Sequence, residues 1–364
     1  MLVRDVVKII ESVAPLGLQE SWDNSGLIIG DPGATVTGTL LCLDVTEDIF
    51  DEASESGCNM IISHHPLVFA GLKKFTGTDP VSRMIRRGIS EDYVIYSAHT
   101  NLDQVLEGVS GAIADKLGFK GKEILVPRQD DLLKLVCFIP DDHFARVVEA
   151  VFSAGAGYVG NYDSCGFNVA GTGSFRAGKG ADPYIGEKGE LHFESEKRFE
   201  TIFPKHIQRD VVSALLSNHP YEEVAYDIYP LRNENKAFGL GVVGELPTPL
   251  SEEEFLRIVK RVFTTGCIRH TAFLNKVVKR VAVLGGSGSE YLKHAVSSGA
   301  DAYITADIKY HQFFNVDNEI LLLDIGHYES EHVALEVLSN ILLKKKTNFA
   351  VHLSKINTNP IKYF

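Results

Sequence analysis

The chain has 364 residues, which predicts two or three domains at roughly 100–200 residues per domain. Hydrophobic residues make up 45% of the chain and charged residues 23%, a composition that excludes disorder of the whole chain and collagen-like or coiled-coil structure. The formal net charge of −12 disfavours general binding to nucleic acid, because proteins that neutralise phosphates are normally basic.

The first residues carry charges every few positions and lack the apolar segment of a secretory signal. No apolar run reaches the roughly 18 residues that a transmembrane helix needs. The five cysteines are far apart and include no C-x-x-C pair, as is typical of reduced thiols in the cytosol. We therefore expect a cytoplasmic protein that does not associate with membranes.

Strands and helices alternate over residues 1–127, which we take as the first lobe of a core. The hydrophobic pattern predicts helices at 3–13, 47–56, 81–87 and 108–117, and strands at 39–44, 59–63 and 93–97. Short apolar strands that alternate with helices favour a mostly parallel α/β sheet, buried on both faces.

The pattern changes over residues 128–235, where the predicted order is β-α-β-β-α-β, the ferredoxin-like plan of an α+β domain. Its helices are expected at 141–154 and 205–217. The α/β pattern then returns over 236–364, with helices at 252–263, 290–298, 309–314 and 331–343, and strands at 281–284, 302–305 and 319–324. The sequence therefore predicts a two-lobed α/β core, residues 1–127 and 236–364, interrupted by an inserted domain.

Histidines and carboxylates follow three of the predicted core strands, at the strand ends where open α/β sheets bind ligands. His64 and His65 come directly after the strand at 59–63, and a turn at Pro66 would let both rings line one pocket. They are poorly placed to chelate one ion together, so the pair suggests two metals with one histidine each. The alternative is a pair of surface histidines.

The second strand end carries His99 and Asp103, and the third carries His327 and Glu331. Asp103 offers a carboxylate ligand, while His99 is either a ligand or a residue that orients one. His327 and Glu331 are four residues apart and share a face on a helical turn. Helix capping is an alternative explanation for Glu331 but not for His327.

Together the three strand ends supply three histidines and two carboxylates without a cysteine. This donor set suits two divalent ions such as zinc, iron or manganese, a pair that commonly activates water in hydrolases. The predicted metal ligands are His64, His65, Asp103, His327 and Glu331.

Two weaker motifs lie in the last part of the chain. The glycine-rich turn 285–288 either holds an anion at a helix N-terminus or is simply a tight strand–helix turn. Asp307 and His311 are also four residues apart, so they either line the same pocket or face solvent.

At these residues the sequence resembles the Nif-three-like family, whose members are known as GTP cyclohydrolase type 2 homologues. The resemblance implies a dinuclear metal site with the same five ligands and with Glu331 shared between the ions. It also implies an inserted domain similar to PII and CutA, and a homohexameric ring. The motifs run in family order over about 1–125 and 237–364, and they are 20–27, 63–66, 99–103, 285–288, 309–311 and 326–331.

Three functions are weighed against these residues. The first is a metal-dependent hydrolase, in which a metal-bound hydroxide attacks a nucleotide-like or phosphoester small molecule and His99 or His311 is the catalytic acid–base residue. The second is a non-enzymatic metal-binding regulatory or interaction protein, with the insert as a sensing or gating module. The third, nucleic-acid handling, is disfavoured by the net charge despite a local basic cluster at Lys73, Lys74, Arg83, Arg86 and Arg87.

Overall fold

The computed structural model describes residues 1–345 and 348–363. The chain forms two compact units, one of Met1–Val126 with Phe238–Phe364 and one of Pro127–Ala237. Within the described residues, no helix is both long and apolar enough to cross a membrane.

A five-stranded sheet of the first unit has the order β1-β4-β3-β2-β15. Strands β2, β3, β4 and β15 run parallel, and β1 is antiparallel to β4. Every residue of β2, β3 and β4 is buried, as the continuous apolar runs predict. The strand bounds are β1 Gly26–Ile29, β2 Gly38–Cys42, β3 Met60–Ser63, β4 Val94–Ser97 and β15 Ala350–Leu353.

Helices cover both faces of this sheet. Ile49 and Phe50 of α2 (Glu47–Glu55) and Ile85 of α3 (Pro80–Ser90) pack on one face. Ile10 of α1 (Val3–Glu11) and Leu338 of α11 (Ala334–Lys344) belong to a second hydrophobic cluster on the other face. This alternation of strands and helices confirms the predicted α/β core.

A six-stranded sheet in the same unit has the order β11-β14-β13-β12-β10-β5. Strands β12, β13 and β14 are parallel, with antiparallel neighbours on both sides. The remaining bounds of the unit are β5 Lys120–Arg128, β10 Asn235–Ser251, β11 Arg269–His270, β12 Val277–Ser287, β13 Ala302–Ala306, β14 Leu321–Asp324, α4 Thr100–Asp103, α5 Val109–Lys116, α8 Glu252–Val262, α9 Leu292–Ser297 and α10 His327–Glu331.

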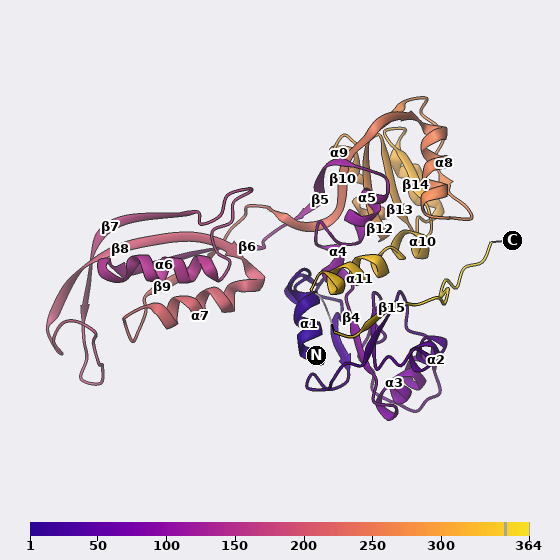
Figure 1. Cartoon of the computed structure of the whole chain (residues 1–364). Coiled ribbons are helices and arrows are strands. Elements are labelled where there is room, and N and C mark those ends of the chain that lie inside the picture. Colours follow the sequence, from indigo (N-terminus) through magenta and orange to yellow (C-terminus); the bar gives the residue numbers. More distant parts are fainter. Residues whose placement is uncertain (346–347, 364) are drawn as a thin grey trace. The chain divides into compact units, whose positions relative to one another are not determined.

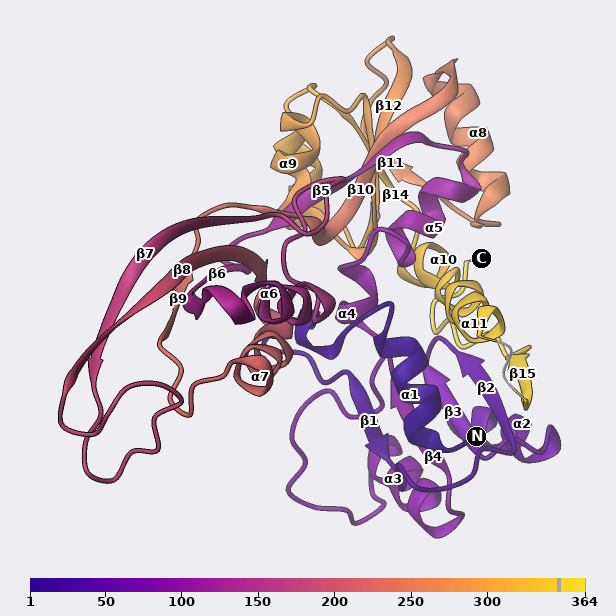
Figure 2. The same cartoon turned by 60° about the vertical axis from the view of Figure 1, so that its left-hand side comes forward.

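Each sheet contains a strand from the part of the sequence that lies on the other side of the insert. The last strand, β15, lies beside β2 in the first sheet (Figure 2), although it comes from the end of the chain. Conversely, β5 joins the second sheet and α5 packs on β12. One hydrophobic cluster contains Ile62 of the first sheet, Val283 of the second sheet and Val109 of α5, so the two lobes have a common core.

The second unit is a four-stranded antiparallel sheet of order β7-β8-β6-β9. Helices α6 (Phe144–Ser153) and α7 (Gln208–Asn218) lie side by side on one of its faces (Figure 1). The element order is β-α-β-β-α-β, which confirms the predicted ferredoxin-like insert. The strands are β6 Leu132–Pro140, β7 Gly166–Arg176, β8 Leu191–Pro204 and β9 Tyr226–Pro230.

Candidate metal site

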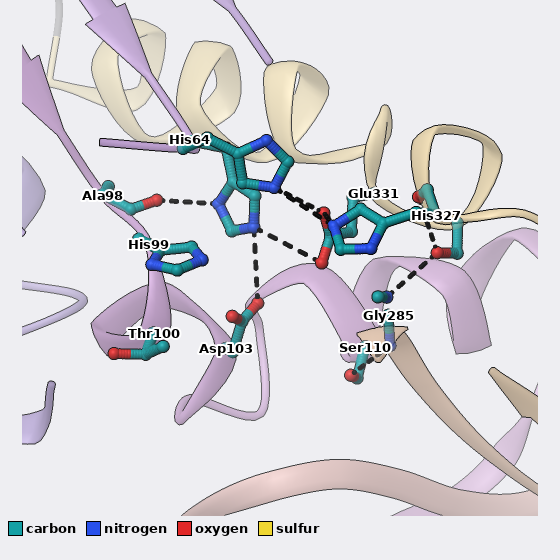
Figure 3. A network of polar contacts seen from close by, with 12 residues as sticks. His64, Ala98, His99, Thr100, Asp103, Ser110, Gly285, His327 and Glu331 are labelled. Carbon is teal, nitrogen blue, oxygen red and sulfur yellow. Dashed lines mark hydrogen bonds and ion pairs between the residues drawn. The ribbon is translucent and has the colours of Figure 1, made fainter. Parts of the chain in front are cut away.

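His64 lies at the carboxyl end of β3 and is completely buried. Its Nδ1 donates a hydrogen bond to the carbonyl oxygen of Ala98, 2.8 Å away, so the lone pair is on Nε2. This Nε2 atom is buried and has no hydrogen-bond partner within the described residues. It lies 3.8 Å from Asp103 Oδ1 and 3.9 Å from Glu331 Oε1, and Figure 3 shows the three groups directed toward one another.

Burial lowers the pKa of His64 to about 3, so its imidazole is neutral at physiological pH. A neutral ring with its lone pair aimed at two carboxylates, at distances too long for hydrogen bonds, fits a cation between them. His64 therefore has the position and the protonation state of a metal ligand, and Asp103 has the position of a second ligand to the same ion.

A second group of side chains gathers around the other oxygen of Glu331. Glu331 Oε2 lies 2.8 Å from Nε2 of His65 and 2.8 Å from Nε2 of His327, and the two Nε2 atoms are 3.4 Å apart. His327 and Glu331 are the first and last residues of α10, so the predicted spacing does place them on one face. His65, His327 and Glu331 form a group that could hold a metal ion.

Carboxylates fix the other ring nitrogen of each of these histidines. His65 Nδ1 donates to Asp44 and His327 Nδ1 donates to Asp307, both over 2.7 Å. Burial alone would lower the pKa of both rings, but the hydrogen bonds to carboxylates raise the pKa of His65 to about 9 and that of His327 to about 11. Without an ion both rings are therefore protonated, and a bound cation would replace their Nε2 protons.

Glu331 connects the two groups through its two oxygens. Burial raises its pKa, but hydrogen bonds from His327 and His65 outweigh this and hold the carboxyl well below its usual range. Burial and the nearby charge of Glu331 raise the pKa of Asp103. An ionised carboxylate with one imidazole at Oε1 and two at Oε2 could serve as a ligand to two ions, and the donor set fits zinc, iron or manganese.

Gly286, near the end of β12, packs directly against this shared carboxylate. A Cβ atom added there would lie 2.1 Å from Glu331 Oε1, and the φ angle of +66° also favours glycine. The glycine-rich turn thus allows a close approach to Glu331. The N–H groups of Gly285 and Gly286 already donate to the hydroxyls of Ser110 and Ser330, which favours a tight strand–helix turn over an anion site.

His99 lies beside the first group, at the end of β4. Its ring contacts those of His64 and His65, with centroids 5.3 and 5.5 Å away. Its Nδ1 donates to Asp23 over 2.8 Å. Burial would raise the pKa of Asp23, but hydrogen bonds from His99 and Thr100 hold it far below its usual range. His64, His65 and His99 also lie close enough together to hold an ion, as His65, His327 and Glu331 do.

His311 lies apart from these residues. It is exposed, it contacts the ring of Tyr310, and it is not among the side chains that line the cavity at the site. The spacing argument fails here because Asp307 precedes the short 3₁₀ helix Tyr310–Val316, so the two residues do not share a helical face. Asp307 instead orients His327.

A cavity of about 440 Å³ opens onto the histidines and Glu331. Trp22 and Phe69 form an aromatic rim, with ring centroids 5.7 Å apart and each within 6.4 Å of the His99 ring. Trp22 and Asp23 lie in the motif 20–27 but had no predicted role in the site, and neither did Phe69 or Asp44. Asp44 follows β2, so the strand-end argument could have found it, whereas nothing local identifies Phe69.

Comparisons with known proteins identify the family to which the chain is similar. The sequence model of the Duf34/NIF3 (NGG1p interacting factor 3) family matches residues 1–360. The GTP cyclohydrolase 1 type 2 homolog of Halalkalibacterium halodurans is 39% identical over 98% of this chain and 98% of its own length. That of Bacillus subtilis is 35% identical over 99% and 98%. The crystal structure of a Bacillus cereus protein related to NIF3 superposes with a TM-score of 0.84, 36% identity and coverage of 100% of this chain and 99% of that one.

Proposed function

The chain belongs to the Duf34/NIF3 family, and on this premise we propose that it is a hydrolase that depends on two divalent metal ions. One ion would be held by His64 and Asp103 and the other by His65 and His327, and Glu331 would contribute to both. The observation that carries the proposal is the position of Glu331, whose Oε1 faces His64 while its Oε2 faces His65 and His327.

The ions would supply Lewis-acid activation of water and of an oxygen on the substrate. The chain supplies the rest. Asp44 and Asp307 keep a proton on Nδ1 of His65 and His327, so that each Nε2 is directed at the site. In the same way Asp23 orients His99, whose Nε2 is the candidate acid–base atom.

The cavity supports a small-molecule substrate. A volume of about 440 Å³ lies within the range of roughly 300–1,000 Å³ typical of small-molecule sites. Trp22 is 57% exposed and Phe69 is 55% exposed, so their rings are available to stack on a planar group. We propose a nucleotide-like or phosphoester substrate with its scissile bond near Glu331.

Hydrolysis of GTP and of generic phosphoesters, measured with and without added zinc, iron or manganese, tests this function. We expect turnover that requires metal and is lost in Glu331→Ala. Turnover that persists in metal-free Glu331→Ala protein would refute the mechanism. Binding of two ions without turnover of any substrate would instead favour a regulatory metal-binding protein.

A further inference from the structure

The second unit contains a cavity of about 650 Å³ on the sheet face opposite α6 and α7. Cys137 and Phe199 point toward the helices and belong to the core of the unit. Their neighbours Phe138 and Arg198 point to the other face, because successive residues of a strand alternate, and they line the cavity. All residues that line it belong to this unit.

Aromatic rings form much of the wall. Phe138, Phe175, Tyr184 and Tyr221 all line the cavity. The ring centroids of Phe175 and Tyr221 are 6.1 Å apart, and those of Tyr184 and Tyr221 are 6.2 Å apart. Such rings bind flat apolar groups, and their faces attract cations.

A buried carboxylate lies among these rings. Glu196 is only 8% exposed, and its Oε1 accepts a hydrogen bond of 2.8 Å from the hydroxyl of Tyr221. Its Oε2 has no hydrogen-bond donor, and no cationic side chain pairs with it, within the part of the chain that the structure describes. Lys197, the next residue along the strand, is paired with Asp141, and Arg198, on the same face as Glu196, is paired with Glu200 at 2.8 Å. Buried glutamates are rarely left without a positive partner. The carboxylate of Glu196 therefore lacks the cation that would usually neutralise it.

Two glycines of β7 make room around this carboxylate. A Cβ atom at Gly173 would lie 2.1 Å from Glu196 Oε2, so only glycine allows the carboxylate its position. Gly171 is paired directly with Glu196 across the strands, and nothing lies within 4 Å of the position that its Cβ would occupy. The space beside the carboxylate is therefore open.

We propose that this cavity binds a small organic cation with a flat apolar body, such as an aromatic amine, amidine or guanidine. Its charge pairs with Glu196, and its flat part lies against Tyr221 and Phe175. A metal ion fits less well, because the aromatic wall offers few ligands and both groups able to hold one among the described residues lie in the other unit. An anion also fits less well, because three carboxylates, Glu196, Glu222 and Glu223, line the cavity. Of the two arginines that line it, Arg176 and Arg198, the second is already paired with Glu200.

Calorimetry on the full chain with benzamidine tests the proposal, with benzamide as the neutral compound of the same shape and benzoate as the anion. We expect saturable binding of benzamidine, and binding at least about tenfold weaker for the other two. Equal binding of benzamidine and benzamide to the unmodified chain would overturn the proposal, whatever the variants do.

Variants locate the site. Glu196→Gln keeps an acceptor for the Tyr221 hydroxyl but removes the charge, so benzamidine binding should weaken at least about tenfold. Gly171→Leu should fill the cavity and abolish binding. Glu194→Gln is the matched control, because Glu194 pairs with His192 and does not line the cavity. Unchanged affinity in both Glu196→Gln and Gly171→Leu would refute the site.

A cation from a second copy of the chain is the competing occupant. If benzamidine does not bind and Glu196→Gln reduces the particle mass measured by light scattering, the cavity is an interface between copies and the proposal is wrong. The binding measurement needs neither metal nor turnover, so its failure is independent of the proposed hydrolase function.

Discussion

Replacing Gly286 by Ala perturbs the candidate metal site through a single added carbon. That carbon would lie 2.1 Å from Glu331 Oε1, so the carboxylate must move by roughly 1 Å to reach an ordinary contact. Its 2.8 Å contacts with His65 and His327 would not survive this shift. A misplaced ligand should weaken metal binding at least about tenfold.

The substitution also strains the backbone and so lowers the free energy of unfolding. The same substitution at a second glycine separates this effect from the effect on Glu331. Alanine at a φ of +66° costs about 1–2 kcal/mol in the free energy of unfolding. Gly299 has a similar φ of +74°, and nothing lies within 4 Å of an added Cβ. Gly299→Ala should therefore show the same backbone cost with unchanged metal affinity.

The assay is metal affinity by competition with a chromophoric chelator, together with urea unfolding of the metal-free protein. We expect both variants to lose a similar amount of stability, and Gly286→Ala alone to lose metal affinity. If Gly286→Ala binds metal as tightly as Gly299→Ala, then Glu331 is not a ligand in the position described, and the reasoning fails.

Three further predictions concern catalysis, pH and assembly. Asp23→Asn should slow metal-dependent hydrolysis about tenfold or more by releasing His99, with unchanged metal content; a rate equal to that of the unmodified chain would remove His99 from the mechanism. Burial lowers the pKa of His206 and His219, so the unfolded chain binds more protons below about pH 6.5, and the insert should lose stability as the pH falls through that value. Hydrogen exchange of the β6 amides, corrected for intrinsic rates, should therefore show less protection at pH 5.5 than at pH 7.5, and equal protection would contradict this assignment. Light scattering of the full chain should give six chains per particle, and a monomer would rule out the expected ring.

Local spacing made part of the site predictable. His327 and Glu331 are joined by one turn of α10, and His64 and His65 by a strand end, so the sequence alone brings each pair together. Each pair lies at the carboxyl end of a parallel strand, which places it at the ligand-binding edge of its own sheet. The two strands, β3 and β14, belong to different sheets, so the meeting of the pairs depends on how the sheets pack together.

Other features depend on tertiary structure and left no local signal. The contact of Asp23 with His99 joins residues 76 positions apart. The addition of β15 to the first sheet is also a long-range contact, because this short strand near the end of the chain pairs with β2 near its beginning. The spacing of Asp307 and His311 misled because it assumed a continuous helix, whereas Asp307 has a φ of +56° and lies before the helical turn.

The account rests most directly on two metal ions held around Glu331. Elemental analysis of the full chain, purified without chelator, should find two divalent ions per chain. The folded Glu331→Ala variant should lose them, while Glu329→Gln on the same helix should keep both, because Glu329 does not line the cavity. An unmodified chain that holds no ion, or a Glu331→Ala variant that still holds two, would contradict the account.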